Sequence, residues 1–553
     1  MADIAGLVLG LVGVLKPLTE ASLFICDLYR DQFRINSGAM QTPSGSVRIS
    51  VSTRQIDIFE SILLANKRFN WLPGSLFQEL EPALQQDVYE VLQELKRRLF
   101  LFVEIGQAYG VGSQQNSLAQ GSPGLSAQAA DRNDRVLSLQ RNTSWARKAL
   151  WSTKDKKTLE GLANEIEHWT ALLRLTMQDI LSRSPEFQST DRLNTLGRPE
   201  EQAEELRLAL AIRRILVSKP SDLSHPAPEL SPRDIQILPA VDNVTPAIMK
   251  TPSGEAKVLV ESKLSGSRTP AEDERRRARA RQLATLLQQT GDPTLRALRA
   301  LGYIYDPQES RVTVVYEIPH HLLPWPLTLR QLFSLKLLEP RPALEHRFRL
   351  ASVVTETLFF FHSLGWVHKS FMSENILLFP RKSLCTKPWQ EAGICSITQV
   401  LQNSEIRLVG FDLARPEAEV SSLRALGDSI ENLWRPPTRW GVPTESWSAV
   451  HDLYSLGAVL LEAGLWQRLD ALEQRINLAD PWAVQKLLLS HATQRLPYTM
   501  GSKYASIVIG LLKGKFDDSA RQEYSSLHTA GGPDHACNRL WILRELNKIS
   551  ACV

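Results

Sequence analysis

A Ser/Pro-rich segment at residues 218–234, SKPSDLSHPAPELSPRD, separates two parts of the chain that differ in pattern. It has no regular spacing of apolar residues, and proline is unfavourable in helix interiors and central strands. The whole chain has 553 residues, too many for one hydrophobic core. We therefore expect a multidomain protein with one domain over 1–217, a linker over 218–234 and a second domain over 235–553.

The first part has the periodicity of amphipathic helices. From Leu84 to Phe102 apolar residues recur every three or four positions, which predicts a buried stripe on one long helix. Residues 159–180 repeat this pattern, and Pro-Glu-Glu opens a third, shorter helix over 199–217. Such stripes need other helices to cover them, so an all-α helical bundle is predicted for residues 1–217.

The second part mixes strand and helix patterns. KVLVESK at 257–263 and RVTVVYEIP at 311–319 are rich in β-branched residues and are predicted as strands. Between them, ERRRARARQLATLLQQ from Glu274 predicts a helix whose arginines fit either a phosphate or membrane patch or a solvated face. Helical patterns dominate after Leu327, so we expect a bilobal α+β domain with a small β-rich unit and a larger helical unit.

Composition narrows the classes of function. With 43% hydrophobic and 22% charged residues, the chain resembles ordinary soluble globular proteins. A net charge of +4 is small for this length, so no nucleic-acid partner is expected. The five cysteines are scattered without metal-ligand spacing, which predicts no metal site and favours a reducing compartment such as the cytoplasm.

The N-terminal segment IAGLVLGLVGVL, residues 4–15, is free of charge but short. As a helix its twelve residues would reach about 18 Å, whereas a hydrocarbon core is about 30 Å thick. Asp3 precedes the segment and Lys16-Pro17 follows it, which is not the pattern of a signal peptide. We therefore expect neither a spanning helix nor a secretion signal here.

One segment of the second part has the layout of a protein-kinase catalytic loop. A kinase carries H-R-D-L-x-x-x-N there, with Asp as the base and Asn as a metal ligand. In HSLGWVHKSFMSENILLF, residues 362–379, His368 and Asn375 keep this spacing, but Ser370 stands at the position of the aspartate. The loop therefore resembles a kinase loop that has lost its base.

Further segments follow in the order of a kinase domain. EIRLVGFDLARP from Glu405 resembles the strand and turn that hold metal, with Gly410-Phe411-Asp412 in place of D-F-G. HDLYSLGAVLLEAGLW from His451 resembles the central helix of the larger lobe, whose first aspartate, here Asp452, bonds the catalytic-loop backbone. VLVESK resembles the strand that carries the phosphate-gripping lysine, here Lys263. Residues 235–553 are thus similar to the protein-kinase family, which implies its bilobal fold.

The departures from the kinase pattern favour a pseudokinase. Ser370 is not a useful base near neutral pH, and Asp412 lies two positions from the metal-binding place. Residues 246–257, where a Gly-rich loop is expected, contain one glycine, and no A-P-E motif is present. The glutamate that should pair with Lys263 has candidates only at the helix start, Glu272 and Glu274. Several losses in a site that works as a unit are hard to rescue.

Each candidate residue therefore has a modest expected role. His368 is expected to be a structural loop histidine, Asn375 to hold its own loop or bind metal weakly, and Asp452 to cap the loop backbone. Lys263 could meet a nucleotide phosphate or be a surface or ion-paired lysine, and Asp412 is a candidate for a metal or cofactor role. ATP is the one cofactor that the resemblance implies. The alternative function is an unorthodox active protein kinase that uses Asp412 or another carboxylate with Lys263 and Asn375.

The first 33 residues, MADIAGLVLGLVGVLKPLTEASLFICDLYRDQF, resemble the start of the fungal HeLo domain of prion-inhibition and propagation proteins. The residues that carry the resemblance are Ala5, Gly6, Leu7, Gly10, Leu11, Gly13 and Tyr29. Together with a degenerate kinase-like domain, this layout is similar to fungal HeLo–kinase-like proteins and to the mixed-lineage-kinase-like effector of necroptosis. The resemblance implies a non-catalytic signalling protein of heterokaryon incompatibility or programmed cell death.

A mechanism follows from the first helix. Gly6 and Gly10 are four residues apart and allow close packing, while Leu7 and Leu11 supply apolar surface. Docked in the bundle, this helix would be part of the core. Released by the kinase-like domain, it would favour a membrane. The residues do not decide between a permanently buried helix and one that is released. The implied partners are other copies of the bundle, an upstream immune-type receptor and membrane lipid, with peripheral plasma-membrane binding on activation. A pure scaffold that binds neither nucleotide nor membrane is the third hypothesis.

Overall fold

The structure, a computed structural model, describes ten residues between 91 and 175, Ile215, most of 226–514 and six residues between 541 and 549. Within 226–514 the gaps are 239–244, 253, 265–269, 289–294, 307, 309–310, 336–340, 383–395, 412–413, 417–428, 442–445 and 474–475. The chain divides into two compact units, residues 1–180 with 198–206, and residues 181–197 with 207–553. The domain boundaries predicted at residues 217 and 234 stay predictions. Ile215, which comes before the first of them, belongs to the second unit.

The described residues of the first unit are helical and form a small part of a core. Leu162, Trp169 and Leu172 are buried on one face at three- and seven-residue steps, as an amphipathic helix requires. The guanidinium of Arg98 donates to the carboxylate of Glu165 at 2.6 Å and lies 5.0 Å from the ring centroid of Trp169. The two predicted helices around residues 91–101 and 162–175 are therefore neighbours.

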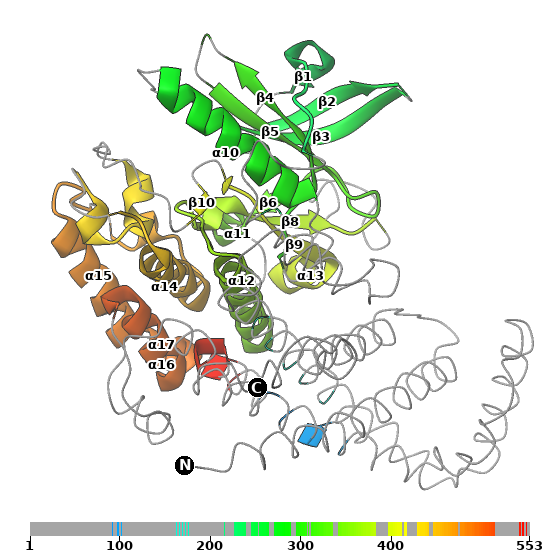
Figure 1. Ribbon diagram of the computed structural model, residues 1–553. Coiled ribbons are helices and arrows are strands. Elements are labelled where there is room, and N and C mark those ends of the chain that lie inside the picture. The colour runs from blue at the N-terminus through cyan, green and yellow to red at the C-terminus, as the bar shows by residue number, and fades with distance from the viewer. Residues whose placement is uncertain are drawn as a thin grey trace, which may run out of the picture. The chain divides into compact units, whose positions relative to one another are not determined.

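A five-stranded antiparallel sheet forms the first part of the second unit (Figure 1). Its strand order is β1-β2-β3-β5-β4. The strands are β1 Ile235–Ile237, β2 Thr245–Thr251, β3 Gly254–Leu264, β4 Ala300–Asp306 and β5 Arg311–Glu317. The strands predicted at 257–263 and 311–319 are confirmed as β3 and β5, which pair in register from Val258 opposite Glu317 to Leu264 opposite Arg311.

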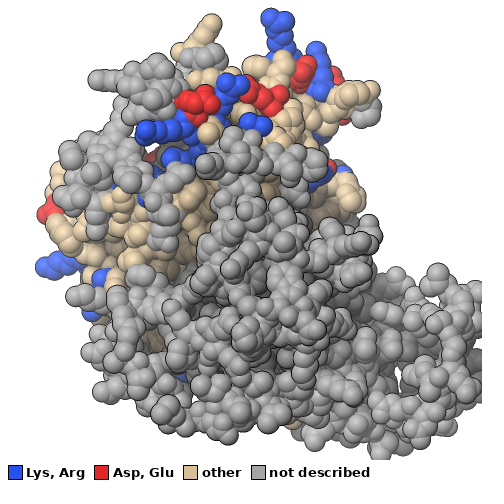
Figure 2. All heavy atoms as spheres, viewed as in Figure 1, with Lys and Arg blue, Asp and Glu red and all other residues tan. Residues whose placement is uncertain are grey.

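Helix α10, Pro270–Gln288, confirms the helix predicted from Glu274 and packs on β4 and β5. Its Leu283, Leu286 and Leu287 are buried, so its arginines occupy the remaining faces. Arg277 donates to Glu229 at 2.7 Å, and Figure 2 shows acidic and basic side chains side by side over this region. On the face that Figure 2 shows, the charges are mixed, as on a solvated helix surface.

Segment 226–230 extends the sheet beyond β4. The N–H of Leu230 donates to the carbonyl of Tyr303 at 2.8 Å, and the N–H of Tyr303 donates to the carbonyl of Pro228 at 3.1 Å. The end of the predicted linker is therefore an ordered part of the second unit, and it covers an otherwise open sheet edge.

Helices dominate after the sheet, as the sequence predicts. The helices are α11 Leu329–Ser334, α12 Leu344–Ser363, α13 Ile397–Asn403, α14 Ala449–Leu465, α15 Pro481–Gln494, α16 Leu496–Met500 and α17 Ser502–Lys513. Short strands lie among them: β6 Leu327–Thr328, β7 Trp366–Val367, β8 Ile376–Pro380, β9 Ser404–Leu408 and β10 Arg415–Pro416. The 3-10 helices are η6 Pro232–Asp234, η7 Ser373–Asn375, η9 Ile430–Trp434, η10 Pro437–Arg439 and η11 Leu469–Ala471. The second unit therefore mixes helices and sheets.

Helix α14 is the centre of the helical part. Every residue from His451 to Leu465 is buried, and α12, α16 and α17 pack around it. A helix buried on all sides must be apolar nearly all round, and its sequence is, apart from a few polar positions. One of these, Asp452, lies in its first turn, where an acidic side chain also interacts favourably with the helix dipole.

Among the described helices, none combines the length and the apolar character that crossing a bilayer requires.

Candidate functional site

The carboxylate of Asp452 organises the loop that follows β7. Its side chain is fully buried and accepts four hydrogen bonds. The backbone N–H groups of His368 and Lys369 donate to it at 2.6 and 2.9 Å. The ring nitrogens His362 Nε2 and Trp447 Nε1 donate at 3.0 and 2.9 Å. Both carboxylate oxygens thus have two donors each, and the loop backbone is fixed to the start of α14.

These donors determine the charge state of Asp452. Burial alone would raise the pKa of this carboxyl, but the hydrogen bond and charge of His362 and the backbone N–H of His368 outweigh it. The resulting pKa lies below the ordinary value, because hydrogen bonds to an ionised carboxylate favour that form. Asp452 is therefore an ionised anchor of the loop at neutral pH.

His368 is packed as a structural residue. Its side chain is completely buried, and its ring lies 5.0 Å from the ring of Phe411 and 5.8 Å from that of Phe371. Its Nε2 lies 3.1 Å from the carbonyl of Val409, and its Nδ1 accepts the N–H of Ser370 at 3.3 Å. With the Nε2 proton donated to Val409, both ring nitrogens are used within the loop, which leaves neither free for proton transfer.

Lys369 adopts a strained backbone conformation beside this anchor. Its φ is +67°, a region that favours glycine. Burial, followed by the charges of Arg415, Arg279 and Arg439, lowers the pKa of Lys369 to about 7. The charge of Asp452 acts in the opposite direction but does not compensate.

Asn375 and Ser370 hold the loop closed on itself. The side-chain amide of Asn375 donates to the backbone carbonyl of Ser370 at 2.6 Å, and both residues are buried. The backbone carbonyl of Asn375 accepts the N–H of Val409 at 2.9 Å. Asn375 thus links the loop to the segment that follows β9, and its amide nitrogen is already used.

Gly410 lies directly against Asn375. Its φ is +85°, and a Cβ atom added here would come within 2.3 Å of Asn375 Nδ2. Both the backbone conformation and the close approach therefore require glycine at this position. The glycine of the Gly410-Phe411 pair is a structural requirement of this turn, and Phe411 is fully buried behind it.

Glu261 is the residue of β3 that reaches this turn. Its side chain is only 5% exposed, and its Oε2 accepts the N–H of Gly410 at 3.0 Å. The hydroxyl of Tyr316, on the neighbouring strand β5, donates to the same oxygen at 3.0 Å. Glu261, Tyr316 and Gly410 form a buried network that joins the five-stranded sheet to the turn after β9.

Glu261 is not among the site residues that the sequence motifs predict. Residues Val258 to Glu261 have the spacing of the V-A-I-K kinase motif, with glutamate at the lysine position, whereas Lys263 follows two positions later. Strand β3 places Lys263 opposite Val312, and the Lys263 side chain lies outside the described residues. The V-x-V-E run that ends at Glu261 was the signal for this position in the sequence. Lys263 drew attention away from it, because a kinase carries a lysine on this strand.

The remaining predicted positions lie partly in strands of the sheet and partly outside the described residues. Residues 246–257, where a phosphate-binding loop was expected, lie in strands β2 and β3 and the turn between them. Asp412 and the N-terminal positions Gly6, Leu7, Gly10 and Leu11 lie outside the described residues, so their roles stay predictions. Within the described part of the chain, no cluster of three His, Cys, Asp or Glu side chains is placed to hold a metal ion.

Comparison with protein-family models gives no match for this chain, and comparison with curated protein sequences gives no significant match.

Proposed function

We propose that the protein is a non-catalytic signalling protein, in which a kinase-like unit without phosphotransfer activity controls a helical N-terminal domain. The observation that carries the proposal is the buried carboxylate of Glu261 on the N–H of Gly410. In a kinase, a lysine of the corresponding strand meets the nucleotide phosphates, and an aspartate of the turn holds Mg²⁺. Here a glutamate and a glycine bind each other instead.

The charge of this network opposes nucleotide binding. A carboxylate that is 5% exposed would face the phosphates with the same sign of charge, in a poorly solvated place where repulsion is strong. Tyr316 is fully buried beside it. A triphosphate would therefore have to displace two hydrogen bonds and meet an unfavourable charge.

The loop around Ser370 supports the same proposal. Phosphotransfer needs a carboxylate that accepts the proton of the substrate hydroxyl, and serine does not supply one near neutral pH. His368 uses one ring nitrogen in the loop and the other on the carbonyl of Val409, and Asn375 Nδ2 donates to the Ser370 carbonyl. Asn375 Oδ1, the atom that would bind a metal, is buried without a hydrogen-bond partner. Ser370 and His368 therefore supply no base here, and the nitrogen of Asn375 holds the loop in shape.

The N-terminal domain supplies the signal in this proposal. The resemblance of residues 1–33 to fungal HeLo domains supports a role in heterokaryon incompatibility or programmed cell death, with the bundle as the effector. Self-association of the bundle, an upstream immune-type receptor and plasma-membrane lipid are the proposed partners. The kinase-like unit would restrain the first helix, and a signal would release it.

Nucleotide binding by the full chain tests the kinase-like half of the proposal. We expect no shift of the melting temperature with up to 5 mM ATP, with or without Mg²⁺, because the phosphate position carries Glu261. A magnesium-dependent stabilisation that disappears in Lys263→Met but persists in Lys250→Met, an exposed lysine of the same sheet, would contradict the proposal. It would favour the active-kinase alternative.

Vesicle leakage tests the membrane half. We expect residues 1–217 to release dye from anionic vesicles, and the full chain to release much less, because the kinase-like unit restrains the bundle. Leu11→Glu should abolish leakage by placing a charge in the apolar segment, whereas Thr19→Glu adds the same charge outside it. If residues 1–217 cause no leakage at any concentration, the membrane role is wrong and a pure scaffold is favoured.

A further inference from the structure

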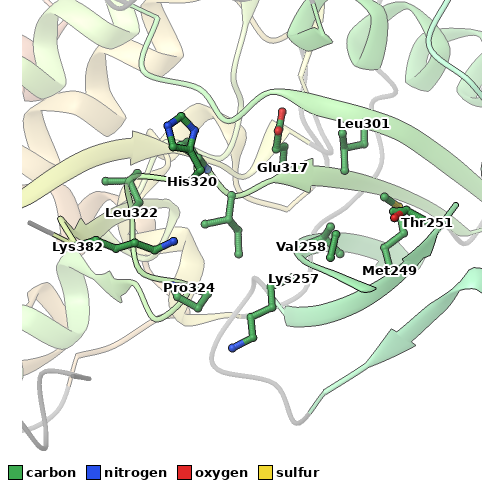
Figure 3. A pocket seen from close by; sticks show the side chains of 13 residues that line it. Met249, Thr251, Lys257, Val258, Leu301, Glu317, His320, Leu322, Pro324 and Lys382 are labelled. Carbon is green, nitrogen blue, oxygen red and sulfur yellow. The ribbon is translucent and has the colours of Figure 1, made fainter. Parts of the chain in front are cut away.

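A cavity of about 430 Å³ lies where β2 and β3 meet the segment that follows β5. Its apolar lining includes Met249, Val258, Leu301 and Leu322. Figure 3 shows side chains of the sheet on one side of the cavity and of the segment around His320 on the other. The volume falls within the range of about 300–1,000 Å³ that is typical of small-molecule sites, and about half of the lining is apolar.

This cavity is separate from the Glu261 network. Val258 is packed in an apolar cluster with Ala247 and Val260, and Met249 packs against that cluster. Glu261, Tyr316 and Gly410 are not among the residues that line the cavity, although Lys257 reaches it from the same face of β3 as Glu261. A ligand in the cavity would therefore contact neither the turn at Gly410 nor the loop at Ser370.

Two lysines give the cavity a positive charge. Lys257 and Lys382 both line it, and both are exposed. The Lys257 ammonium lies 5.4 Å from the ring centroid of Trp325, a side chain that is itself 41% exposed. Figure 3 shows the two lysine side chains approaching from opposite sides of Pro324.

The acidic group of the lining is already paired. Glu317 accepts a hydrogen bond from Arg299 at 3.1 Å. Among the described residues, no ion pair joins a carboxylate to Lys257 or Lys382. The cavity therefore combines a lining that is about half apolar with two ammonium groups whose charge is not balanced by a described neighbour.

We propose that this cavity binds a small amphipathic organic anion, with an aromatic or aliphatic body in the apolar part and one carboxylate or sulfonate at the lysines. The apolar lining stabilises the body through the hydrophobic effect, and the lysines select for the charge. The inference goes beyond the proposed function and does not depend on it, since the residues concerned take no part in the Glu261 network.

The probe for the test is 8-anilinonaphthalene-1-sulfonate, whose fluorescence rises in an apolar site, compared with its uncharged analogue N-phenyl-1-naphthylamine. The full-length chain and its variants are titrated with each probe. The double variant Lys257→Met/Lys382→Met removes both charges and keeps the apolar stems. Lys486→Met, an exposed lysine of α15, is the matched control, because it does not line the cavity.

We expect saturable binding of the sulfonate to the unmodified chain, weakened about tenfold in the double variant and about threefold in each single variant. The uncharged analogue should bind all of these within about twofold, and Lys486→Met should match the unmodified chain. Ala256→Phe, which fills the cavity, should abolish this binding of both probes. Equal sulfonate affinity in the double variant and the unmodified chain would overturn the proposal. An equal loss for both probes, or an equal loss in Lys486→Met, would overturn it too.

Discussion

The substitution Asp452→Asn tests how strongly one buried carboxylate holds the loop at Ser370. In the native protein each oxygen of Asp452 has two donors: His362 and the His368 N–H on one, and the Lys369 N–H and Trp447 on the other. An asparagine offers a single oxygen. In either orientation, two donors would face the new NH₂ group and lose their acceptor.

The magnitude follows from these contacts. A buried donor without an acceptor costs about 1–3 kcal/mol, so two such donors cost about 4 kcal/mol. An independent figure comes from buried ion pairs, in which the removal of one partner costs about 3–5 kcal/mol of stability. We therefore expect Asp452→Asn to lower the free energy of unfolding of the second unit by about 4 kcal/mol.

Urea unfolding measures this loss, with hydrogen exchange of peptides covering residues 362–376 to assign it to the loop. Asp480→Asn is the matched control, because Asp480 is an exposed N-cap that accepts the N–H groups of Trp482 and Ala483. Asparagine caps as well as aspartate, so the control should cost less than about 0.5 kcal/mol. A loss below about 1 kcal/mol for Asp452→Asn, or unchanged exchange in the loop, would refute the reasoning.

Three further predictions concern the same region, each measured by urea unfolding. Gly410→Ala should lower the free energy of unfolding by more than about 3 kcal/mol, because the new Cβ is strained and overlaps Asn375. Gly441→Ala, at φ +63° with open space around it, should lower it by only about 1 kcal/mol. Equal losses would contradict the close approach of Gly410 to Asn375. Glu261→Ala should cost about 3 kcal/mol by leaving two donors unpaired, and Tyr316→Phe about 1 kcal/mol by removing one hydrogen bond; the reverse order would contradict the network. The pKa of Lys369 is about 7 in the folded protein, against an ordinary value of 10.5. Between these pH values the unfolded chain holds a proton that the folded chain has released, so the free energy of unfolding should rise with pH. Lys369→Met should therefore stabilise the protein by about 2 kcal/mol at pH 6.5, below the limit of about 5 kcal/mol set by the full shift, and by much less at pH 9.5; a gain that does not change with pH would contradict the burial of this charge.

The elements of the second unit could be predicted well from the sequence. The strands β3 and β5 and the helices α10 and α14 lie close to their predicted ranges. Their periodicities are properties of neighbouring residues, so a single sequence contains them. The Ser/Pro-rich segment was harder, because its last residues pair with β4, and pairing with a distant strand leaves no local signal.

The loop at Ser370 could be predicted in part. The resemblance to the central helix of a kinase singled out Asp452, and the structure shows its carboxylate on the loop backbone. The sequence also has a serine at position 370, where the resemblance to a kinase loop would place an aspartate. It gave no sign that Trp447 and His362 complete the set of donors, because those contacts join residues that no shared motif connects.

The sequence by itself determined much of the helix and strand pattern of the second unit, and it places a serine, not a carboxylate, at position 370. Only the tertiary structure decided that Glu261 of β3 accepts the hydrogen bond of Gly410, although 149 residues separate them in the chain. The reason is register. The pairing of β3 with β5 fixes which strand residue faces the turn after β9, and a shift of one residue would send every side chain of the strand to the opposite face.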